Sequence, residues 1–171
     1  MTENEKRVYD ALDQLEIPYI RYEHKPAFTI PEVEELMLRT EGDHCKNLFV
    51  RNHHGNRHYL VLVEAHKRAD MKDIASQIGS SRLSFASEER LMKHLGLTPG
   101  SVTPLALVND PERKITVIID EDLKKSERIC FHPNVNNATV SMLYSDFVKF
   151  LKWRGNEVAY VKVKDCSDCK E

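Results

Sequence analysis

The sequence predicts an α+β fold built on a mostly antiparallel or mixed sheet, because short extended segments alternate with capped helical segments. The first observation is a helical repeat of Val8, Leu12 and Leu15 near the N-terminus. The second is a pair of extended segments, 45–51 and 57–65, that flank a polar turn containing glycine. Both alternating faces of 57–65 are apolar, which predicts that other elements cover the sheet on both sides.

The remaining elements follow from local signals along the chain. Helices are expected where a capping residue precedes an amphipathic run, at 2–17, 29–39, 70–78, 87–95 and 145–153. Further strands are expected at 19–23, 105–108, 115–120, 128–132, 138–142 and 157–163. Residues 97–104 are too rich in proline and glycine for regular structure, and they predict a rigid loop.

Size and composition indicate one domain, residues 1–163, followed by a flexible C-terminal tail at 164–171. The 171 residues are 41% apolar, which is enough for one hydrophobic core. A run of about 18 apolar residues is absent, so no membrane-spanning helix is expected. The polar N-terminal segment lacks the apolar stretch of a signal peptide, which predicts a cytoplasmic protein whose cysteines are free thiols.

Charge is distributed unevenly along the chain. The net charge of −2 argues against a general electrostatic binder of nucleic acids. Residues 46–93, however, carry 9 Lys and Arg against 5 Asp and Glu. This segment fits either a focused contact with phosphate groups or an ordinary solvated surface.

The sequence predicts no metal and no cofactor. The pair Cys166 and Cys169 has no second pair of ligands, and a structural zinc site needs four. The histidine-rich turn at 53–58 has no cysteine or carboxylate at ligand spacing. The serine-nucleophile elbow and the phosphate-binding loop are both absent from the sequence.

Three segments remain as candidates for chemistry. On a strand, Lys46 shares a face with Leu48 and Val50, so its ammonium either extends to water or lines a cavity. The loop 100–104 allows a close backbone approach at its glycine and is stiffened by its proline, as in an oxyanion cradle or a structural turn. The segment 131–137 holds a histidine and three amides.

In combination these segments resemble the YbaK/prolyl-tRNA-synthetase-associated editing-domain family, and within it the free-standing ProX type. The resemblance extends from about residue 8 to 163. It rests on Cys-Lys-Asn-Leu-Phe at 45–49, Arg-Leu-Ser-Phe-Ala at 82–86, the GxxxP element at 100–104 and Phe-His-Pro-Asn at 131–134. The family implies a mixed, mostly antiparallel, barrel-like sheet with flanking helices, and residues 1–163 would form a single editing domain.

The resemblance also implies a function and a site. The reaction is hydrolysis of the aminoacyl ester of mischarged tRNA, most of all alanyl-tRNA(Pro), without a cofactor. The residues expected to be catalytic are Lys46, Gly100 and His132. Those expected to bind the aminoacyl-adenosine end, or to form the wall of a small pocket around it, are Asn47, Ser101, Pro104, Phe28 and Ile30.

The expected partner is the acceptor end of tRNA(Pro), with prolyl-tRNA synthetase as a further partner. Arg51 and Arg82 are the candidates for phosphate contacts, within a basic stretch that includes Lys67. A synthetase site sized for proline cannot strongly reject alanine, because a missing methylene changes binding by only about 1–3 kcal/mol. A second site that admits only small side chains would correct the error.

Three alternatives remain open. The same hydrolysis could act on another amino acid such as cysteine, or the chain could be a non-catalytic module that binds aminoacyl-tRNA or a synthetase. Cys45 could also be a thiol nucleophile with His132 as its base. Because neighbouring strand residues point to opposite faces, Cys45 and Lys46 are not expected to serve one pocket, and Lys46 is favoured.

Overall fold

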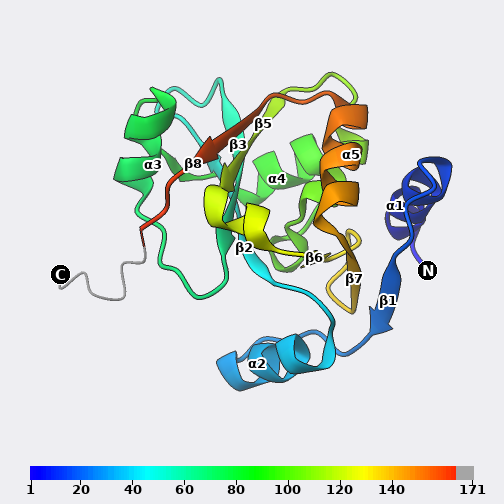
Figure 1. The fold of residues 1–171 in the computed structure, drawn as a ribbon. Coiled ribbons are helices and arrows are strands. Elements are labelled where there is room, and N and C mark those ends of the chain that lie inside the picture. The colour runs from blue at the N-terminus through cyan, green and yellow to red at the C-terminus, as the bar shows by residue number, and fades with distance from the viewer. Residues whose placement is uncertain (165–171) are drawn as a thin grey trace.

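Two β-sheets organise the protein in a computed structural model that describes residues 1–164 (Figure 1). The smaller sheet is antiparallel, with the strand order β1 (Ile20–Glu23), β7 (Ala138–Leu143), β6 (Arg128–Phe131). The larger sheet has the order β4 (Ser84–Phe85), β2 (Cys45–Arg51), β3 (His58–Glu64), β5 (Ile115–Asp120), β8 (Val158–Val161). In it β2 is antiparallel to both β4 and β3, whereas β5 is parallel to both β3 and β8. The predicted α+β fold with a mixed sheet is therefore confirmed.

One short contact joins the two sheets. The Asp43 N–H donates to the Arg128 carbonyl at 2.9 Å, and the Cys130 N–H donates to the Asp43 carbonyl at 2.9 Å. The sheets otherwise keep separate strand orders, so no closed barrel forms in the described part of the chain.

Residues 1–164 form five α-helices, and four of them begin at the capping residues that the sequence predicts. The predicted cap of the fifth helix is wrong, because that helix starts at Tyr144 without a side-chain cap and Ser145 lies inside it. The bounds of the five helices are α1 (Glu3–Gln14), α2 (Ile30–Arg39), α3 (Met71–Ile78), α4 (Glu88–Leu95) and α5 (Tyr144–Arg154). Asp70 and Ser87 accept hydrogen bonds from the first turns of α3 and α4, and Gly79 and Gly96 end these helices with positive φ angles. At these φ angles of 69° and 66°, in the left-handed region, glycine is less strained than any residue with a side chain.

The predicted strand at 105–108 is wrong, because Pro104–Asn109 forms a 3-10 helix. Thr103 begins it by accepting a hydrogen bond from the Leu105 N–H at 3.2 Å. Leu105, Ala106 and Leu107 are fully buried. A short, fully apolar run carries no periodicity that distinguishes a strand from a buried helical turn. The preceding loop contains another 3-10 turn, Pro99–Ser101.

Strand β3 separates two hydrophobic clusters, as its two apolar faces predict. Leu60 and Leu62 face the larger cluster, to which α1, α4 and α5 contribute. Val61 and Val63 face the smaller one, to which α3 contributes. All four of these side chains are fully buried. The hairpin of β2 and β3 is thereby fixed from both sides.

Helix α2 has a different environment from the other helices. Figure 1 shows it projecting from the sheets beside the start of β2, and none of its residues is buried. Thr29 and Glu32 form the predicted capping box, and Pro31 lies in the first turn. No helix within residues 1–164 has the length and apolar content needed to cross a bilayer. The predicted tail beyond Lys164, with Cys166 and Cys169, lies outside the described residues.

Candidate functional site

A cavity of about 530 Å³ lies between α2, the start of β2 and the loops that carry Gly100 and His132. It brings together five of the ten residues that the sequence singles out: Phe28, Ile30, Lys46, Gly100 and His132. Segments far apart in the sequence therefore meet here, because the β2–β3 hairpin, the first 3-10 turn and the β6–β7 loop converge.

Lys46 has its ammonium fixed at the wall of this cavity. Its Nζ donates a hydrogen bond to the carbonyl oxygen of Lys67 at 2.6 Å. Strand β2 places Lys46 opposite Val63, and the chain continues from β3 to Lys67 at the same end of the hairpin. The side chain is exposed, so its charge is available to a ligand in the cavity.

The carbonyl that accepts from Lys46 belongs to a residue with a buried charge. The Lys67 ammonium donates to Asp120 at 3.1 Å, to Asp122 at 2.6 Å and to the Val163 carbonyl at 2.8 Å. Asp120 is fully buried and also accepts from the Glu64 N–H at 3.1 Å. Burial lowers the pKa of Lys67, but the hydrogen bonds that its ammonium donates to Asp122 and Asp120 outweigh burial and raise this pKa. Lys67 is thus a structural cation, and its expected place in an RNA-facing basic stretch is wrong.

Gly100 borders the cavity where another backbone approaches it closely. A Cβ at this position would lie 3.3 Å from the Nδ2 atom of Asn136, which also lines the cavity. A side chain here would therefore push Asn136 away or fill the space beside it. The predicted close backbone approach is observed, and Asn136 is a cavity residue that the sequence did not single out from its neighbouring amides.

His132 has a neutral imidazole, and one of its two ring nitrogens already forms a hydrogen bond. Its Nδ1 donates to the Ala138 carbonyl at 3.0 Å, so Nε2 is the acceptor in the neutral ring. Burial lowers the pKa of His132, and the nearby His24, with ring centroids 6.3 Å apart, lowers it further. The pKa is raised, to a smaller extent, by the hydrogen bond to Ala138. At neutral pH, Nε2 can accept a proton or a hydrogen bond.

His44 is a second neutral imidazole at the cavity, which the sequence did not indicate. The Thr40 hydroxyl donates to the Leu36 carbonyl at 2.9 Å, so the His44 Nε2–H donates to that hydroxyl oxygen at 2.6 Å. Burial, and then the neighbouring His132, lower the pKa of His44 to about 4. A lone histidine next to a predicted strand carries no sequence signal for this role.

One wall of the cavity is apolar. Phe28 and Ile30 are 80% and 75% exposed over the whole residue, although both border the cavity. Three α2 side chains on the same wall were not predicted: Val33, Leu36 and Met37. Helix α2 has no buried residue, and hydrogen bonds of Thr40 join its C-terminal end to His44 at the cavity.

The other five predicted residues do not line this cavity. Asn47 makes a local contact with the Cys45 carbonyl at 3.4 Å, and Ser101 and Pro104 are buried beneath the loop surface. Arg51 lies at the far end of β2, where its guanidinium donates to the carbonyls of residues 52 and 53. Arg82 is exposed, two residues before Ser84, which pairs with Arg51. The two arginines therefore lie near each other, away from Lys46.

Cys45 and Lys46 both line the cavity, so the expectation that a strand would separate them is wrong. The cavity lies at the first residues of β2, where it reaches around the strand end. Burial raises the pKa of the Cys45 thiol far above its usual range, and the nearby Cys130 raises it further. A thiol that stays protonated is a poor nucleophile, so the structure argues against the Cys45 mechanism.

Within the described chain, no group of three His, Cys, Asp or Glu side chains is arranged to hold a metal ion.

The aminoacyl-tRNA editing domain family matches residues 24–150 of the chain. The chain therefore belongs to this family, as the sequence resemblance indicated. The matched segment contains β2, the loop with Gly100 and the loop with His132.

Similarity to individual proteins agrees with this assignment. The chain is 41% identical to the prolyl-tRNA editing protein ProX of Acetoanaerobium sticklandii, over 85% of this chain and 88% of that protein. It is 33% identical to prolyl-tRNA synthetase associated domain-containing protein 1 of Xenopus laevis, over 85% and 89%. A solved structure of a putative trans-editing enzyme for prolyl tRNA synthetase shares the fold, with a TM-score of 0.71 at 22% identity over 96% and 99% of the two chains.

Replacing Asp120 by Asn should weaken both the fold and the site. The substitution leaves the half-exposed Asp122 as the remaining carboxylate partner of the buried Lys67 ammonium, so the cost should be about 2–3 kcal/mol, below that of a buried charge left unpaired. We expect the free energy of unfolding, measured by urea denaturation, to fall by about this amount. The matched control is Glu112→Gln, which removes an exposed ion pair with Lys114 and should leave the free energy of unfolding nearly unchanged. Equal losses for the two variants would contradict the structural role of Lys67.

Stability should fall as the pH drops from about 6.5 towards 4. The folded-state pKa of His44 lies near 4, below its unfolded value of about 6.5, so the unfolded chain binds the proton first. The contribution of neutral His44 to the free energy of unfolding is complete above its unfolded-state pKa and is lost as the pH falls to its folded-state pKa. His44→Phe should make the dependence in this window less steep, although His58, whose pKa burial also lowers to about 4, still contributes; His54→Phe, at an exposed turn position, should leave it unchanged. Identical pH profiles for the two variants would show that His44 is not responsible.

Proposed function

We propose that this protein hydrolyses the ester that joins alanine to tRNA(Pro), and so removes a mischarging error. The observation that carries the proposal is the 530 Å³ cavity. It combines the Lys46 ammonium, the Gly100 backbone and the neutral His132 with an apolar wall, in a chain of the editing family. The relative from Acetoanaerobium sticklandii is named a prolyl-tRNA editing protein, which supports the choice of tRNA.

The reaction needs a positioned water and charge stabilisation more than a strong nucleophile. Water adds to the ester carbonyl carbon and forms a tetrahedral intermediate with a negative oxygen. The bond to the ribose oxygen then breaks, and this oxygen receives the proton that water lost. The products are free alanine and tRNA with its terminal hydroxyl restored.

In this proposal Lys46 stabilises the negative charge that develops on the substrate. Its ammonium is held at 2.6 Å by the Lys67 carbonyl, so little reorganisation is needed when a substrate arrives. The same charge can hold the phosphate of the terminal adenosine. Gly100 would bring its backbone close to the ester, with Asn136 beside it.

His132 would use Nε2 to accept a hydrogen bond from the substrate. Since Nδ1 is committed to Ala138, Nε2 is the nitrogen that can accept from the α-amino group, the attacking water or a ribose hydroxyl. The ribose hydroxyl next to the ester can itself assist the water, so the proposal requires no protein nucleophile.

Selection for alanine would come from the apolar wall of α2. In this proposal the alanine methyl group lies beside Ile30 and Val33, which line the cavity, and the same wall excludes the larger pyrrolidine ring of proline. Overlap can reject a larger group more strongly than the roughly 1–3 kcal/mol that a missing methylene provides.

Binding of the RNA would rest on charges outside the cavity. Arg51 and Arg82, at the far end of β2, are proposed to contact phosphates of the acceptor stem. Such contacts orient the RNA without reading its sequence. The names of the relatives support prolyl-tRNA synthetase as a further partner.

A different amino acid is the main competing specificity. A relative 24% identical, over 74% of this chain and 75% of that protein, is named multifunctional Ser/Thr-tRNA deacylase ProXp-y of Escherichia coli. Cysteine, close to serine in size, is a further candidate substrate. A non-catalytic binding module is disfavoured because the Lys46 ammonium is fixed and exposed to the cavity.

Lys46→Ala should reduce kcat for alanyl-tRNA(Pro) by roughly 10²- to 10³-fold, the usual loss when one oxyanion donor is removed. Its melting temperature should stay within a few degrees of the wild type, because the side chain is exposed. The matched control is Lys152→Ala, an exposed lysine of α5 that does not line the cavity. A Lys46→Ala protein with full activity would exclude Lys46 from the mechanism.

A panel of charged tRNA(Pro) substrates tests the specificity. Alanyl-tRNA(Pro) should be hydrolysed at least tenfold faster than seryl- or cysteinyl-tRNA(Pro), and prolyl-tRNA(Pro) should be spared. Ile30→Ala and Val33→Ala should raise the rate for prolyl-tRNA(Pro), because each substitution shortens the wall. Equal hydrolysis of alanyl- and prolyl-tRNA(Pro) by the wild type would remove the editing role.

A further inference from the structure

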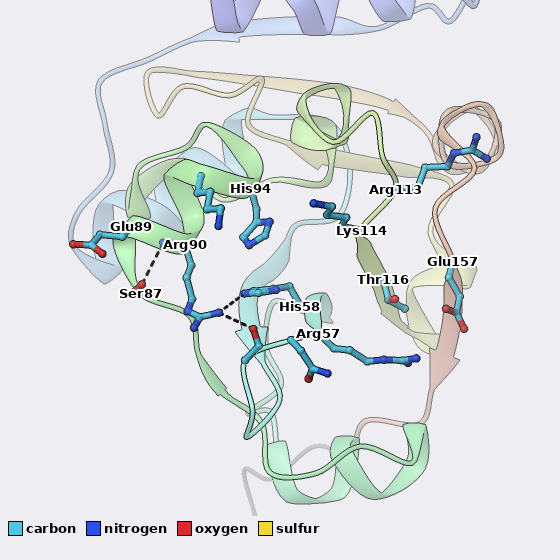
Figure 2. A pocket seen from close by; sticks show the side chains of 13 residues that line it. Arg57, His58, Ser87, Glu89, Arg90, His94, Arg113, Lys114, Thr116 and Glu157 are labelled. Carbon is cyan, nitrogen blue, oxygen red and sulfur yellow. Dashed lines mark hydrogen bonds between the residues drawn. The ribbon is translucent and has the colours of Figure 1, made fainter.

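A second cavity, of about 880 Å³, opens at the opposite end of the β2–β3 hairpin (Figure 2). It lies between the hairpin turn, α4 and the start of β5. Residues 45 and 64 pair at the end near Lys46, whereas Arg51 and His58 pair at the end near the second cavity. The five residue steps from Lys46 to Arg51 along strand β2 span about 17 Å, so the two cavities are separate.

The second cavity is strongly basic in a protein whose net charge is −2. Two carboxylates line it, Glu89 and Glu157, and Figure 2 shows them on opposite sides of the view. Five cationic side chains line it: Arg57, Arg90, Lys93, Arg113 and Lys114. Within residues 1–164, only Lys114 among these five forms an ion pair, with a Glu112 side chain that is itself 70% exposed. The five cations outnumber Glu89, Glu157 and Glu112, so a net positive charge of two remains at this cavity.

Arg90 is held in place at the floor of this cavity. Its Nη1 donates to the Gly55 carbonyl at 2.9 Å and to His58 Nε2 at 3.0 Å, as the dashed lines in Figure 2 show. Gly55 has a φ of 71°, and a Cβ there would lie 2.8 Å from Arg90 Nη2. The turn thus fits closely over the guanidinium. Neither Nε nor Nη2 of Arg90 has a hydrogen-bond partner among the described residues, so the guanidinium keeps unused donors.

The histidines beside Arg90 respond to the same positive charges. His58 and His94 have ring centroids 4.2 Å apart. Burial, then His94 and Arg90, lower the pKa of His58 to about 4. Burial, then Lys93, also lower the pKa of His94. Both rings are therefore neutral at pH 7 and leave the charge of the cavity to its arginines and lysines.

We propose that the second cavity binds backbone phosphates of the RNA substrate, at a contact remote from the ester. This inference rests on the proposed function. Phosphate oxygens suit the guanidinium of Arg90 and the exposed cations of Arg57 and Lys93 around it. Arg51 lies at the same end of the hairpin as this cavity, where it pairs with His58, and Arg82 is exposed close to it, so these two cations extend the positive charge around the cavity. A polymer with several phosphates can contact such a cluster at more than one point, whereas a free phosphate would occupy only one point of it.

The contact should contribute affinity and orientation rather than chemistry. Anchoring the RNA about 17 Å from Lys46 would hold its aminoacyl end in the first cavity without reading bases. It would also make binding more sensitive to salt, since each neutralised phosphate releases counterions.

The test is the double variant Arg57→Glu/Lys93→Glu. Its matched control is Lys6→Glu/Lys152→Glu, which changes the net charge equally at exposed positions outside the cavity. For full-length tRNA that carries no amino acid, we expect the Kd of the double variant to be at least tenfold higher than that of the control. The slope of log K against log salt should become shallower by about one to two. Melting temperatures establish that both proteins are folded.

A short substrate separates this inference from the proposed function. An alanyl ester of the terminal CCA trinucleotide is too short to reach the second cavity, so the double variant should hydrolyse it like the wild type. Equal Kd values for tRNA in the double variant and the control would overturn the inference, as would impaired hydrolysis of the trinucleotide. Failure of the wild type to hydrolyse either substrate would instead remove the proposed function, while the Kd comparison would still test the cavity.

Tripolyphosphate distinguishes RNA from a free anion. If the double variant loses tripolyphosphate binding but retains tRNA affinity equal to that of the control, the cavity is a small-anion site and the inference is wrong. If the double variant loses both tripolyphosphate binding and tRNA affinity, the result supports recognition of phosphate by this cavity and its contact with RNA.

Discussion

The buried ammonium of Lys67 is the contact on which the candidate site depends. It ties the segment after β3 to the end of β5 and to the segment after β8, through Asp120, Asp122 and the Val163 carbonyl. A buried charge is tolerated only when such partners surround it, so this arrangement allows little displacement. The carbonyl of the same residue receives the Lys46 ammonium at 2.6 Å. A structural cation thereby determines where a functional cation lies.

The two cavities lie at opposite ends of the β2–β3 hairpin. Strand β3 is buried on both faces and fixes the hairpin. At one end lies a cavity with an ammonium, two neutral imidazoles and an apolar wall. At the other lies a polar cavity with several unpaired cations. Chemistry on the ester and attachment of the RNA can thus be served by separate surfaces on the same rigid element.

The sequence predicted well those features that depend on local signals. Capping residues such as Asp70 and Ser87 located helix starts, and the alternating apolar residues of 58–64 predicted a strand buried on both sides. Lys46, Gly100 and His132 were grouped through a family resemblance, and the structure brings them to one cavity. Spacing alone would not have grouped them, because they belong to separate segments of the fold.

Features that depend on tertiary contacts could not be read from the chain. In the sequence Lys67 is one member of a basic stretch. Its burial against Asp120 could not be predicted, because Asp120 lies 53 positions away along the chain. His44 gave no signal, because its hydrogen bond to Thr40 depends on how α2 ends. The 3-10 helix at 104–109 was mistaken for a strand, since burial of its apolar residues overrides their weak periodicity.

A double-mutant cycle between Lys46→Ala and Asp120→Asn, measured as kcat/KM for alanyl-tRNA(Pro), tests the central claim most directly. If Asp120 acts on catalysis by positioning Lys46 through Lys67, its substitution should reduce activity in the wild type. It should then have little further effect once Lys46 is gone, under conditions where all four proteins are folded. Fully additive losses would contradict the account, because they would show that the buried cation and the exposed one act independently.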